Sequence, residues 1–487
     1  MSDNTTFIWT DGTSDEISLT MIDDNFTSKY GRQKADLEEL IVGDRVRSIE
    51  SNAFKMCKNL KKITMSSKVE KIGVFAFAWC EKLEEINLPD GLETVSISTF
   101  TFCTSLKKIR IPDSVTLIDD EAFSYCTDLA EVILPKNLNC IYVSAFINCK
   151  SLSSIRIPAS TETIDGLAFA NCESLETVEF EDGAKLKEIG SSAFSSCPKL
   201  DLVNQQALVK LKTIGDRAFE NCVSLSAFDF PQELSRIGDS AFSGCSSLSG
   251  EIVFPASLKN LASEIFANCT SLESVKFIPR EKYILKSGIF AGCENLKKVT
   301  GLNNAKEIHD CAFMGCTSLN NLTFGAGLTS IGDWAFKGCL ALDLTVPSNV
   351  SKIGKDAFAY IHQLTYEGSA SGAPWGFASS DNPLDITTQQ YFDISGRNVP
   401  DEQQMRLLAF DLAWYLQYLN QHDVLSDSLR EQYETGILKY ARGDDNEYIL
   451  ANLLNGFDDV YDTEEFPLNA DVEKFRDRLY IFSKELV

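Results

Sequence analysis

Cysteine is the residue type in this chain with the widest chemistry, because its thiolate binds zinc, forms disulfides and acts as a nucleophile. The chain contains 15 cysteines, and 13 of them follow a recurring phenylalanine by three positions. A straight column of thiols cannot surround one zinc ion, and parallel side chains on adjacent repeats disfavour the torsion of a disulfide. We therefore interpret these 13 residues as small buried apolar groups. Cys140 and Cys311 lie outside the series, at positions that are mostly polar in other repeats, and are predicted to be exposed, reactive thiols.

Catalytic motifs are missing from the rest of the sequence. The three histidines, His309, His362 and His422, belong to no H-E-x-x-H pattern, and no G-x-S-x-G, P-loop or dinucleotide fingerprint occurs. No two cysteines have the Cys-x-x-Cys spacing of a zinc site. We therefore predict a protein that is not an enzyme and that has no cofactor and no metal site.

The recurring phenylalanine marks a repeat of 22 to 25 residues that occurs fourteen times. A unit this short cannot bury its own apolar face, so successive units must stack as a solenoid. Within one unit, Leu106, Ile109 and Ile111 alternate as in a β-strand, and Pro112 ends the strand because it lacks a backbone donor. The phenylalanines of the series are Phe54, Phe77, Phe100, Phe123, Phe146, Phe169, Phe194, Phe219, Phe242, Phe266, Phe290, Phe313, Phe336 and Phe358.

The repeat resembles the BspA-like, or bacterial surface-antigen-type, leucine-rich repeats, whose consensus is close to LxxIxIPxxVxxIGxxAFxxC. One unit of this chain, residues 106–126, reads LKKIRIPDSVTLIDDEAFSYC, and the resemblance extends from Val46 to about Tyr366. It implies an α/β solenoid of about fourteen coils. It also implies a cell-surface or secreted role in adhesion. The segments 366–369 and 374–376 resemble the motif that closes such arrays.

The chain divides into four parts by composition and periodicity. Residues 1–45 are expected to form an N-terminal cap, 46–376 the leucine-rich repeat solenoid with its closing cap, and 377–398 a linker. In the remainder, 399–487, apolar residues recur with helical spacing, which predicts a small all-α domain of four amphipathic helices. This last part is also strongly acidic.

The charge and hydropathy of the chain exclude some partners. A net charge of −25 argues against nucleic-acid binding, which needs clustered Lys and Arg. No run of 18 apolar residues occurs, which argues against a membrane span, and Met1–Thr20 has no signal-peptide pattern. We expect a cytoplasmic monomer, or a secreted or cell-surface protein if a signal peptide was removed.

The candidate binding site consists of basic residues that the strand pattern places on the concave face of the solenoid. They are Lys62, Lys108, Arg110 and Arg156 in the N-terminal third and Lys276 and Lys298 further along. They indicate a site for an acidic protein partner, which could be the chain's own C-terminal domain. Ordinary solubilising charge would give the same pattern. The function expected is that of a non-enzymatic protein-interaction scaffold. The alternatives are an adhesin or secreted host-interaction factor, and an effector with an unrecognised C-terminal activity.

Overall fold

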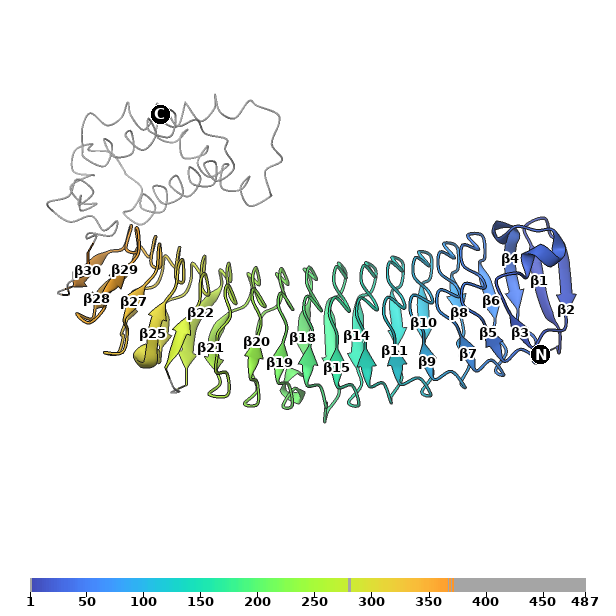
Figure 1. Ribbon diagram of the computed structural model, residues 1–487, viewed down its shortest axis with the longest axis horizontal. Helices are drawn as coiled ribbons and strands as arrows, with labels where there is room; N and C mark the ends of the chain where they lie inside the picture. Colours follow the sequence, from blue (N-terminus) through green and yellow to red (C-terminus); the bar gives the residue numbers. More distant parts are fainter. Residues whose placement is uncertain (1, 279–281, 367, 369, 372–487) are drawn as a thin grey trace, which may run out of the picture.

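The computed structural model of the chain describes residues 2–278, 282–366, 368, 370 and 371. In this part the chain winds into a long solenoid of stacked coils (Figure 1). The predicted linker 377–398, the predicted helical domain 399–487 and the closing segment 374–376 lie outside the described residues.

Every described coil except the one at residues 225–230 contributes a first strand to a ladder that runs along the solenoid. The strands pair in parallel, one coil to the next, because equivalent apolar residues occupy equivalent positions. The ladder consists of three sheets. Its strands are β4 (Leu37–Ile41), β6 (Lys62–Thr64), β8 (Glu85–Ile86), β10 (Lys108–Arg110), β12 (Glu131–Ile133), β14 (Ser154–Ile157), β16 (Thr177–Phe180), β18 (Asp201–Val203), β21 (Gly250–Phe254), β22 (Leu272–Phe277), β24 (Lys298–Thr300), β26 (Asn321–Leu322), β28 (Asp343–Val346) and β30 (Gln363–Tyr366).

In most coils a second, shorter strand forms a second parallel ladder, and residues 259–262 of one coil form no such strand. In most coils this strand is two residues long, and the second of the two residues is buried. The strands are β3 (Met21–Ile22), β5 (Ser48–Ile49), β7 (Lys71–Ile72), β9 (Thr94–Val95), β11 (Leu117–Ile118), β13 (Cys140–Ile141), β15 (Thr163–Ile164), β17 (Glu188–Ile189), β19 (Thr213–Ile214), β20 (Arg236–Ile237), β23 (Tyr283–Leu285), β25 (Ala305–Ile308), β27 (Ser330–Ile331) and β29 (Lys352–Ile353).

The N-terminal end of the array is covered by an antiparallel hairpin. Strand β1 (Thr5–Trp9) pairs with β2 (Ser14–Ile17) and, on its other side, with β4. The 3-10 turns η1 (Thr27–Tyr30) and η2 (Lys34–Asp36) connect this hairpin to the first coils. Two further 3-10 turns, η3 (Gln205–Ala207) and η4 (Leu302–Asn304), lie in loops between the first and second strands.

The coils are closed by turns, and in this respect the predicted α/β class is wrong for the described residues, which contain no α-helix. The Ala-Phe-x-x-Cys segments form the upper edge of the array in Figure 1. In each coil the residue just before this segment and one residue inside it have left-handed backbone, such as Asn52 (φ 61°) and Met56 (φ 66°). Alternate amides therefore bond between coils, as from the Phe54 nitrogen to the Ala76 oxygen at 2.7 Å, whereas the amides between them bond to the carbonyl three residues earlier, as from Cys57 to Phe54 at 3.1 Å.

The recurring phenylalanines form a continuous ladder of rings in the core. All are fully buried, and neighbouring ring centroids lie 5.3 Å apart for Phe54 and Phe77 and 5.2 Å apart for Phe146 and Phe169. The ladder begins earlier than the repeat predicts, because Phe26 lies 4.9 Å from Phe54. At the other end, Tyr366 packs against the core. The core is thus a set of stacked columns, as the sequence predicts.

Candidate binding surfaces

The thiols of the repeat lie in a buried column beside the phenylalanine ladder. From Cys80 onward, each column cysteine donates a hydrogen bond from Sγ to the carbonyl oxygen of the phenylalanine one coil earlier, as Cys126 does to Phe100 at 3.1 Å. All fifteen cysteines are unpaired with one another. Burial raises the pKa of the Cys57 thiol to about 12. A thiol in this state is a poor nucleophile and a poor metal ligand, because both roles need the thiolate.

The prediction that Cys140 is an exposed, reactive thiol is wrong. Cys140 lies in β13 between Leu117 and Thr163 of the adjacent strands, and it is 9% exposed. Burial, with nearby Asp165, raises its pKa to about 12. Cys311 is half-buried, and burial, with nearby Asp310, raises its pKa above the ordinary value.

The described histidines form isolated pairs with carboxylates. His309 Nε2 lies 3.4 Å from Glu307 Oε2, and His362 Nδ1 lies 2.5 Å from Asp343 Oδ1. No group of three or more His, Cys, Asp and Glu side chains in the described part of the chain is arranged to hold a metal ion. Within residues 2–371, apart from the undescribed positions, no helix is long and apolar enough to cross a membrane.

The six basic residues of the predicted site are all exposed on the first-strand ladder. Lys62, Lys108 and Arg110 lie on β6 and β10 of one sheet, and Arg156 lies on β14 of the next sheet. Lys276 and Lys298 lie far along the array on the adjacent strands β22 and β24, where their register partners are Thr300 and Ser274. The structure therefore forms two separate groups from the six residues.

The first group alternates with acidic residues along the sheet. Glu39, Lys62, Glu85, Lys108 and Glu131 are successive register partners from β4 to β12. The ammonium of Lys108 lies 3.4 Å from the carboxylate of Glu85.

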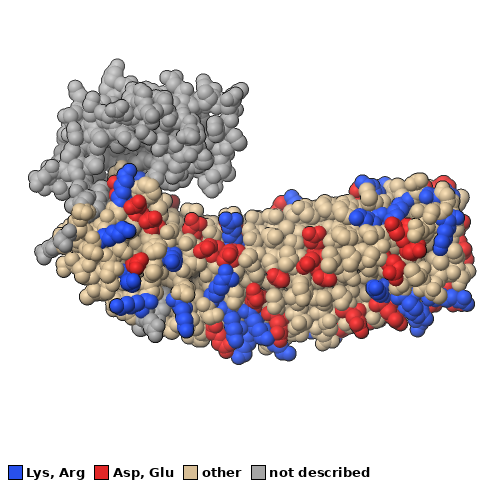
Figure 2. Space-filling view, in the orientation of Figure 1, with Lys and Arg blue, Asp and Glu red and all other residues tan. Residues whose placement is uncertain are grey.

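The guanidinium of Arg156 is placed in the same way, 3.1 Å from the carboxylate of Glu181 and 3.9 Å from that of Glu179. Figure 2 shows charges of both signs interspersed over one face of the array. Much of the positive charge of the first group is therefore balanced by acidic side chains of neighbouring coils.

Sequence reasoning missed an apolar surface on the turns that close the first coils. Met56, Phe75, Trp79, Phe102 and Tyr125 form this surface, which we name the aromatic stripe. The rings of Trp79 and Phe102 stack with centroids 5.5 Å apart, and those of Phe102 and Tyr125 with centroids 4.5 Å apart. Met56 is 51% exposed and Tyr125 is 40% exposed. Of the eleven large exposed hydrophobic residues in the described chain, six lie on these turns between residues 56 and 167.

The signal for the stripe is present in the repeat. Trp79, Phe102 and Tyr125 each stand two positions after the recurring phenylalanine, where later repeats have Asn148 and Asn171. All of these residues have left-handed backbone, with φ between 58° and 60°. Asparagine accepts this conformation readily, whereas it is unfavourable for bulky side chains. Neither core packing nor backbone preference therefore accounts for aromatic residues at these positions.

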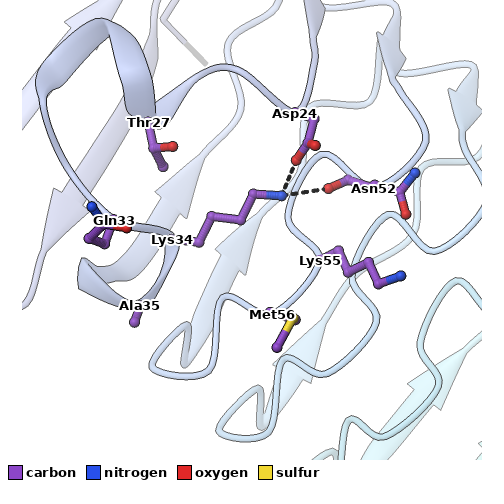
Figure 3. A pocket seen from close by; sticks show the side chains of 8 residues that line it. All are labelled: Asp24, Thr27, Gln33, Lys34, Ala35, Asn52, Lys55 and Met56. Carbon is purple, nitrogen blue, oxygen red and sulfur yellow. Dashed lines mark hydrogen bonds and ion pairs between the residues drawn. The ribbon is translucent and has the colours of Figure 1, made fainter.

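A hollow of about 540 Å³ lies at the N-terminal end of the stripe. It is lined by Asp24, Thr27, Gln33, Lys34, Ala35, Asn52, Lys55 and Met56. Figure 3 shows Lys34 lying across it, with its ammonium directed to the Asp24 carboxylate and to the backbone oxygen of Asn52. The ammonium of Lys55 lies 4.6 Å from the ring centroid of Phe75 and 5.1 Å from that of Trp79. Lys55 thus joins the hollow to the stripe.

Comparison with known proteins agrees with this architecture. A family model described as BspA type leucine rich repeat region (6 copies) matches residues 28–152, 93–222, 168–290 and 283–367. No curated protein matches the chain. A leucine-rich repeat protein from Bacteroides ovatus is 28% identical, with a TM-score of 0.55 over 70% of this chain and 87% of that chain.

A leucine rich cell surface protein from Faecalibacterium prausnitzii is 25% identical, with a TM-score of 0.41 over 76% of this chain and 95% of that chain. The family model spans well over half of the sequence, including every coil from the N-terminal turns to Tyr366. The chain therefore belongs to the family of proteins with BspA-type leucine-rich repeats.

Proposed function

We propose that this protein is a non-catalytic binding protein that takes a protein partner on the aromatic stripe of its repeat array. The observation that carries the proposal is the run of Trp79, Phe102 and Tyr125 in three successive coils, partly exposed to solvent. Exposed apolar patches on otherwise polar surfaces mark interaction sites, and Trp and Tyr are enriched among the residues that dominate binding energy.

The stripe suits a protein better than a sugar or a nucleotide. Its rings stack on one another with interplanar angles of 5° and 8°, so they cover each other's faces and present edges to solvent. A sugar or a base would stack on an open ring face. Ring edges with neighbouring aliphatic groups, such as the 37% exposed Ile97, form a surface that buries against apolar side chains.

Site-specific photo-crosslinking in the full chain tests this proposal. A photoreactive phenylalanine analogue replaces Phe102 in cells that produce the protein, and the matched control carries it at Val209, which is 58% exposed away from the stripe. We expect a covalent adduct with a polypeptide from position 102 and none from position 209. Equal adducts from both positions, or none from position 102, would refute the proposal.

We propose a second contact surface on the first-strand ladder at Lys276 and Lys298, whose register partners are Thr300 and Ser274. Exposed ammonium groups attract an acidic partner, and the attraction weakens with salt because the Debye length is about 8 Å at physiological ionic strength. Lys276→Glu together with Lys298→Glu is expected to weaken partner capture. In the N-terminal group, Lys108→Glu with Arg110→Glu is expected to have less effect, because Lys108 is already paired with Glu85. Equal capture by all variants would remove this surface from the proposal.

The second candidate function is that of an adhesin or secreted host-interaction factor. It is favoured by membership in the BspA-type family, whose name refers to a bacterial surface antigen. Labelling intact source cells with a reagent that does not cross membranes distinguishes the two locations. Labelled protein on intact cells, or protein in the medium, supports the adhesin. Labelling only after lysis supports an intracellular scaffold.

A further inference from the structure

The aromatic stripe has opposite charges at its two ends. At the N-terminal end, Lys55 lies over the rings of Phe75 and Trp79. At the other end, Glu121 is exposed beside Tyr125, and its carboxylate accepts a hydrogen bond from the Ser98 hydroxyl at 3.1 Å. Between these ends the surface is apolar. Such a surface is complementary to itself when one copy is reversed.

We propose that the occupant of the aromatic stripe is a second copy of this chain, bound with its array antiparallel to the first. The inference rests on the proposed function, since it names the protein partner of the same surface. It departs from the monomer that the sequence leads us to expect. A two-fold axis closes such a contact into a dimer, because each copy offers the same patch.

The coil spacing fixes which residues meet. A two-fold axis that crosses the stripe between Trp79 and Phe102 places Trp79 of each copy against Phe102 of the other. One coil further out, Met56 then faces Tyr125. The Lys55 ammonium lies over Phe75, two residues before the recurring phenylalanine, and the Glu121 carboxylate is bonded to Ser98, which has the same position in the next coil. Because the axis pairs these two coils and preserves the position across the turn, the ammonium comes opposite the carboxylate, which gives two attractive pairs in the dimer. A parallel arrangement would instead bring Lys55 against Lys55, and like charges opposite one another are repulsive.

The hollow at the end of the stripe fits the same arrangement. In the third coil from the axis, Ile147 and the 39% exposed Val143 come opposite the coil of the other copy that contains the hollow. They provide apolar groups for the wall formed by Ala35 and Met56. Later coils have Asn171 and Ser196 on the turns, which would form a polar rim.

Sedimentation velocity of the full chain tests the dimer. The wild-type protein is expected to change from monomer to dimer as its concentration rises through the micromolar range, because stable dimers bury about 800 Å² per partner and the stripe covers only a few coils. Trp79→Asn with Phe102→Asn should abolish the dimer. These variants should fold, since asparagine occupies the same position in later coils, and an unchanged thermal melt verifies this. Val209→Asn is the control and should still dimerise.

Charge exchange tests the antiparallel order. Lys55→Glu alone and Glu121→Lys alone should each dimerise less well than wild type, since each places like charges together twice. A mixture of the two single variants should form a heterodimer, because both cross-pairs then have opposite signs. A parallel dimer would pair each position with itself, so Lys55→Glu and Glu121→Lys would each dimerise as well as wild type, and that result would overturn the proposed order.

The failure of this inference differs from the failure of the proposed function. A wild-type chain that stays monomeric at every concentration, or a dimer unchanged by Trp79→Asn with Phe102→Asn, overturns the second copy as occupant. If the crosslinker at position 102 then captures a different polypeptide, or residues 372–487 of its own chain, the stripe has that occupant instead. If it captures a second copy, peptide mapping of the adduct identifies the contacting coil, which should contain Trp79.

Discussion

The thiol of Cys126 donates a hydrogen bond to the carbonyl oxygen of Phe100, one coil earlier, across 3.1 Å. The same oxygen accepts the Cys103 amide at 3.1 Å. The contact recurs from Cys80 to Cys339, so cysteine supplies a donor between coils at a position that is fully buried. Alanine would leave the carbonyl with one partner fewer, which is a physical reason for cysteine at this position.

Thiol labelling should be slow for nearly all of the protein. The column cysteines are buried, and Cys140 is now expected to behave like them because burial raises its pKa to about 12. Half-buried Cys311 should react first with a thiol reagent at neutral pH, and the others only after unfolding. Mass spectrometry of labelled peptides over time gives the order. Fast labelling of Cys140 would contradict its burial, and fast labelling of most of the 15 thiols would contradict the buried column.

Alkaline pH should destabilise the array through these thiols. Burial raises the pKa of Cys57 from the ordinary value near 9.0 to about 12, so the folded state holds the proton more tightly than the unfolded state. The stabilisation is complete below pH 9 and is lost between about pH 9 and 12, at roughly 1.4 kcal/mol per pH unit for one thiol. Denaturant titrations of Cys57→Ala should therefore show a shallower pH slope. Ile72→Val, a neighbouring core change without a titrating group, should keep the wild-type slope.

Truncation of one ring in the ladder should be costly. Phe169 is fully buried between Phe146 and Phe194, with centroids 5.2 Å and 5.3 Å away. Phe169→Ala should lower the free energy of unfolding by about 3–5 kcal/mol, and chemical denaturation measures it. Because each coil contacts only its neighbours, unfolding is expected to separate into two transitions. Tyr125→Ala, on the exposed stripe, is the control, and a loss below about 1 kcal/mol for Phe169→Ala would contradict the ladder.

The period of the sequence predicts the columns because a stacked solenoid repeats the environment of each position. The phenylalanine ladder, the buried thiol column and the strands after the recurring leucine follow directly. Phe26 was not predicted because neither the alanine before it nor the cysteine after it is present, although its ring lies 4.9 Å from that of Phe54, tilted by 48°. A phenylalanine can therefore extend the ladder of rings without the rest of the Ala-Phe-x-x-Cys motif.

The features that the sequence did not predict depend on neighbours in other coils. Cys140 stands at a polar position of the repeat, but it lies between its register partners Leu117 and Thr163 on the two adjacent strands and is buried. The described coils are closed by turns without α-helix, against the predicted α/β class, and alternate amides of these turns bond from coil to coil. The aromatic stripe was missed because only strand residues were considered as a binding face. Comparing each turn position across all repeats would have found Trp79 and Phe102.

A glycine after the second strand should resist substitution. A Cβ on Gly190 would lie 2.5 Å from the Gly166 nitrogen and 2.6 Å from the Asp165 carbonyl carbon, both backbone atoms of the preceding coil. Gly190→Ala should therefore destabilise the array by about 1–3 kcal/mol, as overpacking does. At Gly91 the nearest atom is 3.8 Å away, so Gly91→Ala should be nearly neutral. Thermal melts of the two variants compare them, and equal stability would mean that the coils separate more easily than their packing indicates.

Removal of residues 399–487 should leave the melting of the array almost unchanged. The last coil is already covered by Tyr366, which packs against the core and donates a hydrogen bond from Oη to the Val350 oxygen at 2.6 Å. The Ala370 amide in turn donates to Tyr366 Oη at 3.0 Å, which fixes the chain beyond the strand. Tyr366→Ala in the full chain is the matched comparison. It removes this cover, so it should lower the melting temperature more than the deletion does. Differential scanning calorimetry with light scattering measures both, and a deleted chain that aggregates would show that residues 399–487 are needed to cover the array.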